Sequence, residues 1–155
     1  MSKEKLKTIG LPADLSPSSA EQLADLADLF AWPEQQILFR EGEIHSRLYW
    51  IEQGRVRLEM SGARSGATSL LTVGPGDLLA WSALLGDGRM TATATTTEPT
   101  TLIAFDAGAL LNLCEENHDI GYKVMYTVAK LLSKRLIATR LQLLDLFQNP
   151  PGVGR

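Results

Sequence analysis

The sequence predicts a mainly β fold of the α+β class: an antiparallel sandwich, barrel or jelly roll between a short N-terminal helix and a long C-terminal helix. From Gln36 to Phe105, short β-prone runs start 11, 8, 12, 10, 12 and 11 residues apart. Glycine-rich turns separate these runs, which favours antiparallel strands over a parallel βαβ sheet. After Asp106 the apolar residues instead recur at steps of three and four, as helices require.

Length, charge and hydropathy indicate which broad class of protein this is. The 155 residues suffice for one domain with a core and a long helix. The 15 basic and 18 acidic residues give a net charge of -3, so the chain has no general attraction to nucleic acid or to anionic membranes. The polar start, Met1 to Gly10, is unlike a signal peptide, and no apolar run approaches the length of a membrane helix. We therefore expect a soluble, cytoplasmic protein.

The N-terminal helix is predicted from about Pro17 to Phe30. It follows a tail, residues 1–14, and begins with Ser16 before Pro17, a combination typical of a helix start. Apolar residues then recur at helical spacing. Proline at position 33 ends the segment, because the residue before a proline is pushed out of the helical region.

The strands are predicted from local composition. They begin near Ile37, Leu48, Val56, Thr68, Leu78, Met90 and Thr101. The segment from Val56 to Met60 alternates apolar and polar residues, as expected of a strand with one buried face. The threonine-rich run from Thr91 to Thr97 suits a pleated strand better than a helix.

Two helices are expected after the strands. Asp106 is the predicted N-cap of the first, and a break from Glu116 to Asp119 separates it from a long helix, Asp119–Phe147. One apolar stripe of the long helix comprises Met125, Val128, Leu132, Leu136, Thr139, Leu143 and Leu146. A second stripe includes Tyr122, Val124, Leu131, Ile137, Leu141 and Leu144. Since one β domain covers one side of a helix, the first stripe predicts a homodimer through this helix. Residues 148–155 form a tail rich in proline and glycine.

The order of several motifs resembles a known family. Phe39–Glu43, Arg47–Ile51 and Gly54–Leu58 are similar to the opening strands of the cyclic-nucleotide-binding domain superfamily, of the catabolite-activator and fumarate-nitrate-regulator type. Gly74–Asp77 resembles the turn before that family's phosphate-binding cassette. The resemblance spans residues 15–147, including the helix 119–147. It implies a jelly-roll-like β-roll (a double-stranded β-helix), a dimerising C-terminal helix and a regulatory or sensor role.

The cassette departs from the family pattern. In the family, an arginine and helix-terminal amides hold the cyclic phosphate, and a glutamate holds the ribose. Here Trp81 stands at the glutamate position, Ala80 at the preceding glycine and Met90 at the arginine, while Arg89 lies one residue away. The resemblance therefore predicts that cyclic AMP and cyclic GMP are not bound in the usual way. A different ligand, such as a small anion or nucleotide, and a collapsed pocket both remain open.

The candidate ligand-binding residues each have a second interpretation. They are Trp81, Ser82, Ala83, Leu84, Arg89, Met90 and Thr91. Trp81 stacks on a planar ligand or, as we favour, fills the interior of the roll. The amides of residues 82–84 offer an anion site or are merely capped. Arg89 captures that anion or is an exposed loop residue, and Thr91 adds a hydroxyl or is an ordinary strand residue.

Other chemistry finds no support in the sequence. His45 and His118 lie far apart, and Cys114 is a lone cysteine, so we expect no metal site, no disulfide and no cofactor. No nucleophile–base arrangement indicates an enzyme. The basic residues of the long helix, Lys123 to Arg140, are expected to form a solvated face. Only eight residues follow Phe147, so we expect no DNA-reading module. A structural dimer that docks onto a protein partner, with Trp81 plugging the pocket, is the alternative to a sensor.

Overall fold

Two four-stranded antiparallel sheets form the body of the protein. The computed structural model describes residues 6, 10, 15–61 and 68–148. The first sheet has the order β1-β8-β3-β6, and the second has the order β2-β7-β4-β5. In chain order the strands are β1 (Asp28–Trp32), β2 (Ile37–Phe39), β3 (Arg47–Gln53), β4 (Val56–Ser61), β5 (Thr68–Val73), β6 (Leu78–Leu79), β7 (Thr93–Thr96) and β8 (Thr100–Asp106). The predicted jelly-roll-like fold is thus confirmed.

The N-terminal prediction needs one correction. Helix α2 (Pro17–Leu26) begins where expected, and the Ser19 amide donates a hydrogen bond to the Ser16 hydroxyl at 3.1 Å. The helix ends earlier than predicted, however, and the following residues form β1, paired with β8. The prediction of helix to Phe30 was wrong because pairing with the edge of β8 satisfies the backbone there, and this is not visible in local spacing.

Six of the seven predicted strand starts lie within one residue of those observed. The exception is the run expected to begin near Met90, since β7 begins at Thr93. The intervening segment is still tied to the roll, because the Met90 amide donates to the Glu43 carbonyl at 2.8 Å and the Met90 carbonyl accepts from the Gly42 amide at 2.8 Å. Residue 90 is therefore fixed in the interior without belonging to a strand.

The joint between the last two helices is built on Asn117. Helix α4 (Ala107–Glu116) starts at the predicted cap, where the Asp106 carboxylate accepts from the Ala109 amide at 2.9 Å. Asn117 then caps α5 (His118–Gln148) by accepting from the Ile120 amide at 3.2 Å. Its amide nitrogen donates to the Ser19 hydroxyl at 3.1 Å, which ties the joint to α2.

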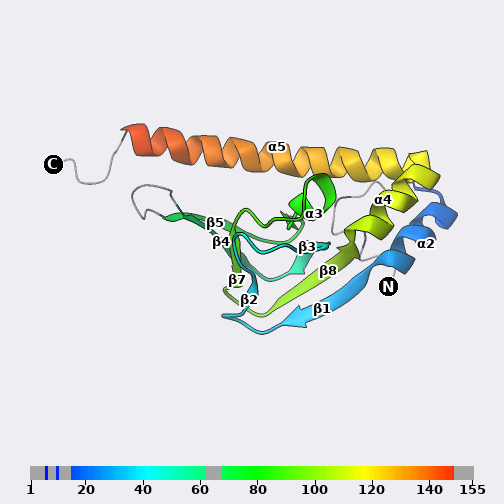
Figure 1. Ribbon diagram of the computed structural model, residues 1–155, viewed down its shortest axis with the longest axis horizontal. Coiled ribbons are helices and arrows are strands. Elements are labelled where there is room, and N and C mark those ends of the chain that lie inside the picture. Colours follow the sequence, from blue (N-terminus) through cyan, green and yellow to red (C-terminus); the bar gives the residue numbers. More distant parts are fainter. Residues whose placement is uncertain (1–5, 7–9, 11–14, 62–67, 149–155) are drawn as a thin grey trace.

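Helix α5 lies along one side of the whole roll (Figure 1). Its buried residues Val124 and Val128 join the core between the helices and the first sheet, around Trp50 and Phe105. Farther along, Gln142 donates to the Leu70 carbonyl of β5 at 2.9 Å. Within the described residues, no helix is long and apolar enough to cross a membrane. Helix α5 thus connects the α2–α4 end of the molecule to the second sheet.

Candidate functional site

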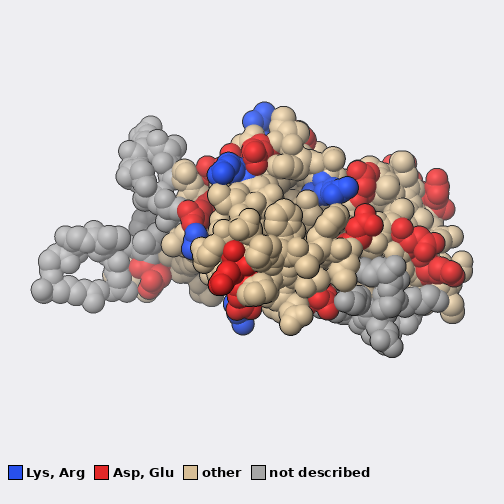
Figure 2. Space-filling view, turned by 90° about the horizontal axis from the view of Figure 1, so that it is seen from below, with Lys and Arg blue, Asp and Glu red and all other residues tan. Residues whose placement is uncertain are grey.

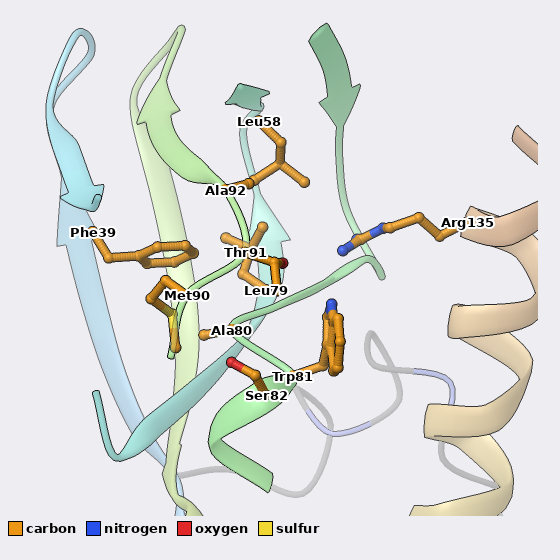
Figure 3. A pocket seen from close by; sticks show the side chains of 10 residues that line it. All are labelled: Phe39, Leu58, Leu79, Ala80, Trp81, Ser82, Met90, Thr91, Ala92 and Arg135. Atoms are coloured by element: carbon orange, nitrogen blue, oxygen red, sulfur yellow. The ribbon is translucent and has the colours of Figure 1, made fainter. Parts of the chain in front are cut away.

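A small cavity lies where the resemblance places the cassette. It is lined by Phe39, Leu58, Leu79, Ala80, Trp81, Ser82, Met90, Thr91, Ala92 and Arg135 (Figure 3). Its volume is about 20 Å³, enough for a single water molecule. Small-molecule pockets are usually ~300–1,000 Å³. In this conformation, therefore, the cavity holds no nucleotide-sized ligand.

Met90 fills the interior. Its side chain is 2% exposed and packs between the sheets with Phe39, Leu79 and Ala92. A thioether offers no charge to a phosphate, and its contacts with these apolar side chains favour the closed cavity. The residue at the family's arginine position is therefore part of the core.

Trp81 does not fill the interior of the roll, the position that we favoured. It precedes the four-residue helix α3 (Ser82–Leu85) and is only half-buried, packed against the core beneath α4 and α5. Ser82 and Leu84 are the buried side chains of α3, so the indole lies on the outer side of this short helix, at the mouth of the cavity. The predicted plug of the roll interior is thus provided by Met90 rather than by Trp81.

Ala80 has an unusual backbone. Its φ of 61° lies in the left-handed region, which glycine adopts freely and alanine adopts at a penalty of roughly 1–2 kcal/mol. The resemblance places a glycine at this position, and alanine here adopts a backbone conformation that glycine adopts freely. The turn directs Trp81 toward the mouth.

Arg89 does not line the cavity. Its exposed guanidinium donates to the Gly42 carbonyl at 3.1 Å, and its amide donates to the Asp87 carboxylate at 3.0 Å. The Arg89 carbonyl accepts from the Ser82 hydroxyl at 2.7 Å. The structure therefore places Arg89 in the exposed loop and leaves Ser82 already engaged.

Two of the three backbone amides predicted for an anion site are also occupied. The Ala83 amide donates to the Ala80 carbonyl at 3.1 Å, and the Leu84 amide donates to the Trp81 carbonyl at 3.0 Å. Thr91, by contrast, is exposed and lines the cavity. Of the predicted site residues, the structure brings Trp81, Ser82, Met90 and Thr91 to the cavity.

Arg135 is the charged residue of the cavity that sequence reasoning missed. It reaches the cavity from α5, where its guanidinium donates to the Leu78 carbonyl at 2.6 Å. Burial lowers the pKa of this guanidinium, and the charge of Asp77 acts in the opposite direction. We counted Arg135 among the solvated basic residues, yet it follows the buried Val124 and Val128 at steps of four and seven. That spacing was the signal for an inward-facing arginine.

The stripe predicted for the dimer is divided between two environments. Val128 is 2% exposed in the chain's own core, and Met125 and Leu132 pack partly against the same cluster. Leu136 is 69% exposed, Leu143 is also exposed, and the Thr139 hydroxyl donates to the Arg135 carbonyl at 2.9 Å. The side chain of Leu146 lies outside the described residues. The outward seam instead runs through Tyr122, Tyr126, Ala129, Ser133, Leu136, Arg140 and Leu143, again at steps of four and three.

Charged side chains are unevenly distributed over the surface. Acidic side chains gather at the α2–α4 end of the face opposite α5 (Figure 2). Among the residues that the structure describes, no three His, Cys, Asp or Glu side chains form a group suited to a metal ion.

Comparison with known proteins identifies the family. A family model described as a cyclic nucleotide-binding domain matches residues 29–117. The CRP-like cAMP-activated global transcriptional regulator of Mycobacterium tuberculosis is 29% identical over 151 residues, which are 96% of this chain and 65% of that protein. The chain thus spans slightly less than two thirds of this relative.

Solved structures agree on the fold. A cyclic nucleotide-binding domain from Methylobacillus flagellatus has a TM-score of 0.82 at 21% identity, over 99% of this chain and 85% of that one. The Thermus thermophilus catabolite activator protein has a TM-score of 0.68 at 28% identity, over 88% of this chain and 62% of that one. With the matched family model and the jelly-roll-like architecture, these findings show that the chain belongs to the cyclic nucleotide-binding domain family.

Proposed function

We propose that this regulatory domain responds to a ligand other than cyclic AMP or cyclic GMP held by the family's usual contacts. The observation that carries the proposal is the small cavity. The buried Met90 side chain occupies the interior beside it, and the remaining volume is about 20 Å³. A cyclic phosphate placed there would meet a thioether instead of an arginine. A ribose hydroxyl would meet the indole of Trp81 instead of a carboxylate.

The energetic consequence is large. A hydrogen bond to a charged group contributes ~1.5–3 kcal/mol, so each missing contact lowers affinity by about tenfold or more. Opening the cavity would also expose apolar surface on Met90 and Phe39, which burial currently removes from water. Both terms oppose the binding of a cyclic mononucleotide in the usual pose.

We further propose that α5 transmits the response and forms a homodimer. Arg135 connects the cavity to α5, and the opposite side of that helix exposes Tyr122, Tyr126, Leu136 and Leu143. A shift of Arg135 would therefore move a helix whose outer face is available to a second copy. Within the described residues, α2, α4 and α5 all pack against the roll or each other, so we propose that residues 15–148 do not themselves read DNA.

A second candidate is a protein-interaction dimer in which the cavity has no ligand. It is favoured by the same packing of Met90, together with the exposed side of α5. In this case the cassette is a structural remnant, and the signal enters through a partner protein.

A thermal-shift panel separates these functions. A ligand at about a hundred times its Kd stabilises the folded state by ~2.7 kcal/mol, which raises the Tm of a domain of this size by roughly 5–10 °C. We expect no such shift with cyclic AMP or cyclic GMP, and a shift with one compound among cyclic dinucleotides, ATP and simple phosphates. A rise in Tm of roughly 5–10 °C with cyclic AMP overturns the proposal. If no compound of the panel changes the Tm, the protein-interaction dimer is favoured. The proposal that these residues do not read DNA is tested by a gel shift with random DNA at low salt. We expect no retardation.

A further inference from the structure

We infer that the mouth of the cavity binds a phosphate-type anion through Arg135, which reaches it from α5. The inference rests on the proposed function, in which the family's own phosphate contact at position 90 is absent. It names the chemical class of the ligand and the residue that selects it.

The mouth is lined by donors. Arg135 and Trp81 lie on the same side of the cavity, and the indole nitrogen is on the side toward Arg135 (Figure 3). The hydroxyl of Thr91 lies between them and the strands. An indole N–H and a guanidinium donate but do not accept hydrogen bonds, and a hydroxyl can donate. None of the described residues that line the cavity is an aspartate or glutamate, so this mouth suits an acceptor with negative charge.

Arg135 lacks a matched counter-charge at the mouth. A guanidinium carries several N–H donors, and among the described residues its hydrogen-bond acceptor is the neutral Leu78 carbonyl. The charge of Asp77 acts on Arg135, and the Asp77 carboxylate accepts a hydrogen bond from the Gly74 amide at 2.9 Å. Within the described residues, this half-buried guanidinium has one neutral hydrogen-bond acceptor, whereas a phosphate oxygen would provide both charge and geometry.

The size of the cavity places the anion at the mouth. About 20 Å³ does not admit a phosphate beside Met90, whereas Trp81 and Arg135 are only half-buried, so we place the anion where these two side chains reach solvent. An anion that takes the guanidinium would remove it from the Leu78 carbonyl, which precedes α3 along the chain. Binding therefore exchanges a contact between α5 and the roll for a contact between α5 and the ligand.

Tryptophan fluorescence of the full chain tests this site. Inorganic phosphate and pyrophosphate are titrated separately, with chloride added to hold ionic strength constant, and ATP and cyclic AMP form further arms. We expect a saturable change in emission with phosphate or pyrophosphate, and loss of that change in Trp81→Phe. Arg135→Met should raise the anion concentration at the midpoint of the titration about tenfold or more. The matched control Arg140→Met alters an exposed arginine of the same helix and should leave the midpoint unchanged.

The outcomes are distinguishable. Absence of a saturable response in the wild type, or a response that Arg135→Met retains, overturns the anion site and leaves the proposed function standing. Tight binding of cyclic AMP that depends on Arg135 overturns the proposed function while supporting the site. A circular dichroism melt of Arg135→Met establishes that the variant is folded. Should it be unfolded, Arg135→Lys keeps the charge without the forked geometry and is expected to respond more weakly than wild type.

Discussion

At position 90, the residue in the interior differs from the arginine of the family pattern. A buried thioether stands there instead of a cation, and its neighbours Phe39, Leu79 and Ala92 are all apolar. We expect Met90→Arg alone to destabilise the protein by about 3 kcal/mol, because an unpaired charge would enter a dry interior. Urea denaturation measures the change. Leu85→Arg, at an exposed position of α3, is the control and should change the stability by less than about 0.5 kcal/mol. Equal stability of both variants would contradict the packing described for Met90.

The buried thiol of Cys114 predicts that the stability of the protein depends on pH. Burial raises the pKa of this thiol above its ordinary value of 9.0, so the folded state retains the proton more strongly than the unfolded state. Stability should therefore fall as the pH rises above about 9, and the thiol should react slowly with alkylating reagents in the native protein. Denaturation between pH 8 and 10 measures this loss, which Cys114→Ala should reduce. Rapid alkylation at pH 8 would contradict the buried position.

Residue identity alone predicted part of the site and missed the rest. The departures at positions 81 and 90 are visible in the sequence, because turn motifs fix the alignment around them. The roles of the two side chains are not visible, since backbone hydrogen bonds with Gly42 and Glu43 hold Met90 in the interior, whereas Trp81 precedes α3 and lies at the mouth. Arg135 was missed because its partner, the Leu78 carbonyl, is 57 residues away in sequence.

At the scale of elements, the Asn117 joint sets the direction of α5. Its side chain caps that helix and also holds the Ser19 hydroxyl of α2. Asn117→Ala should destabilise the protein by about 1–2 kcal/mol, because a helix cap and a second hydrogen bond are lost together. Thermal denaturation measures the change. Asn112→Ala, an exposed site on α4, is the control, and a similar small effect in both variants would contradict the role of the joint.

The elements also show where periodicity is insufficient. Strand β1 was predicted as the end of a helix because its pairing partner β8 lies about seventy residues later in the chain. On α5, two apolar stripes were recognised, but spacing alone does not reveal which one faces the roll. Burial of Val124, Val128 and Arg135 shows that the inward face takes residues from both stripes, including Val128 of the stripe that we assigned to a partner.

For the whole molecule, the outward seam of α5 predicts the assembly. Exposed Tyr122, Tyr126 and Leu136 lie on the side of the helix away from the roll, and a second copy would bury them. We expect a dimer in sedimentation velocity at tens of micromolar, and Leu136→Lys should shift it toward monomer. Ile44→Lys, at an exposed apolar residue outside α5, should leave the dimer intact. A monomeric wild type at that concentration would remove this part of the proposal.

Calorimetric titration of cyclic AMP tests most directly whether the cassette lacks the family's usual nucleotide binding. The titration compares wild type with the double variant Trp81→Glu/Met90→Arg, which restores the carboxylate and the arginine of the family pattern. We predict no saturable heat for wild type, and a less stable double variant that gains measurable affinity. Tight binding of cyclic AMP by wild type, or a double variant that is fully stable and still does not bind, would contradict the account of this cavity.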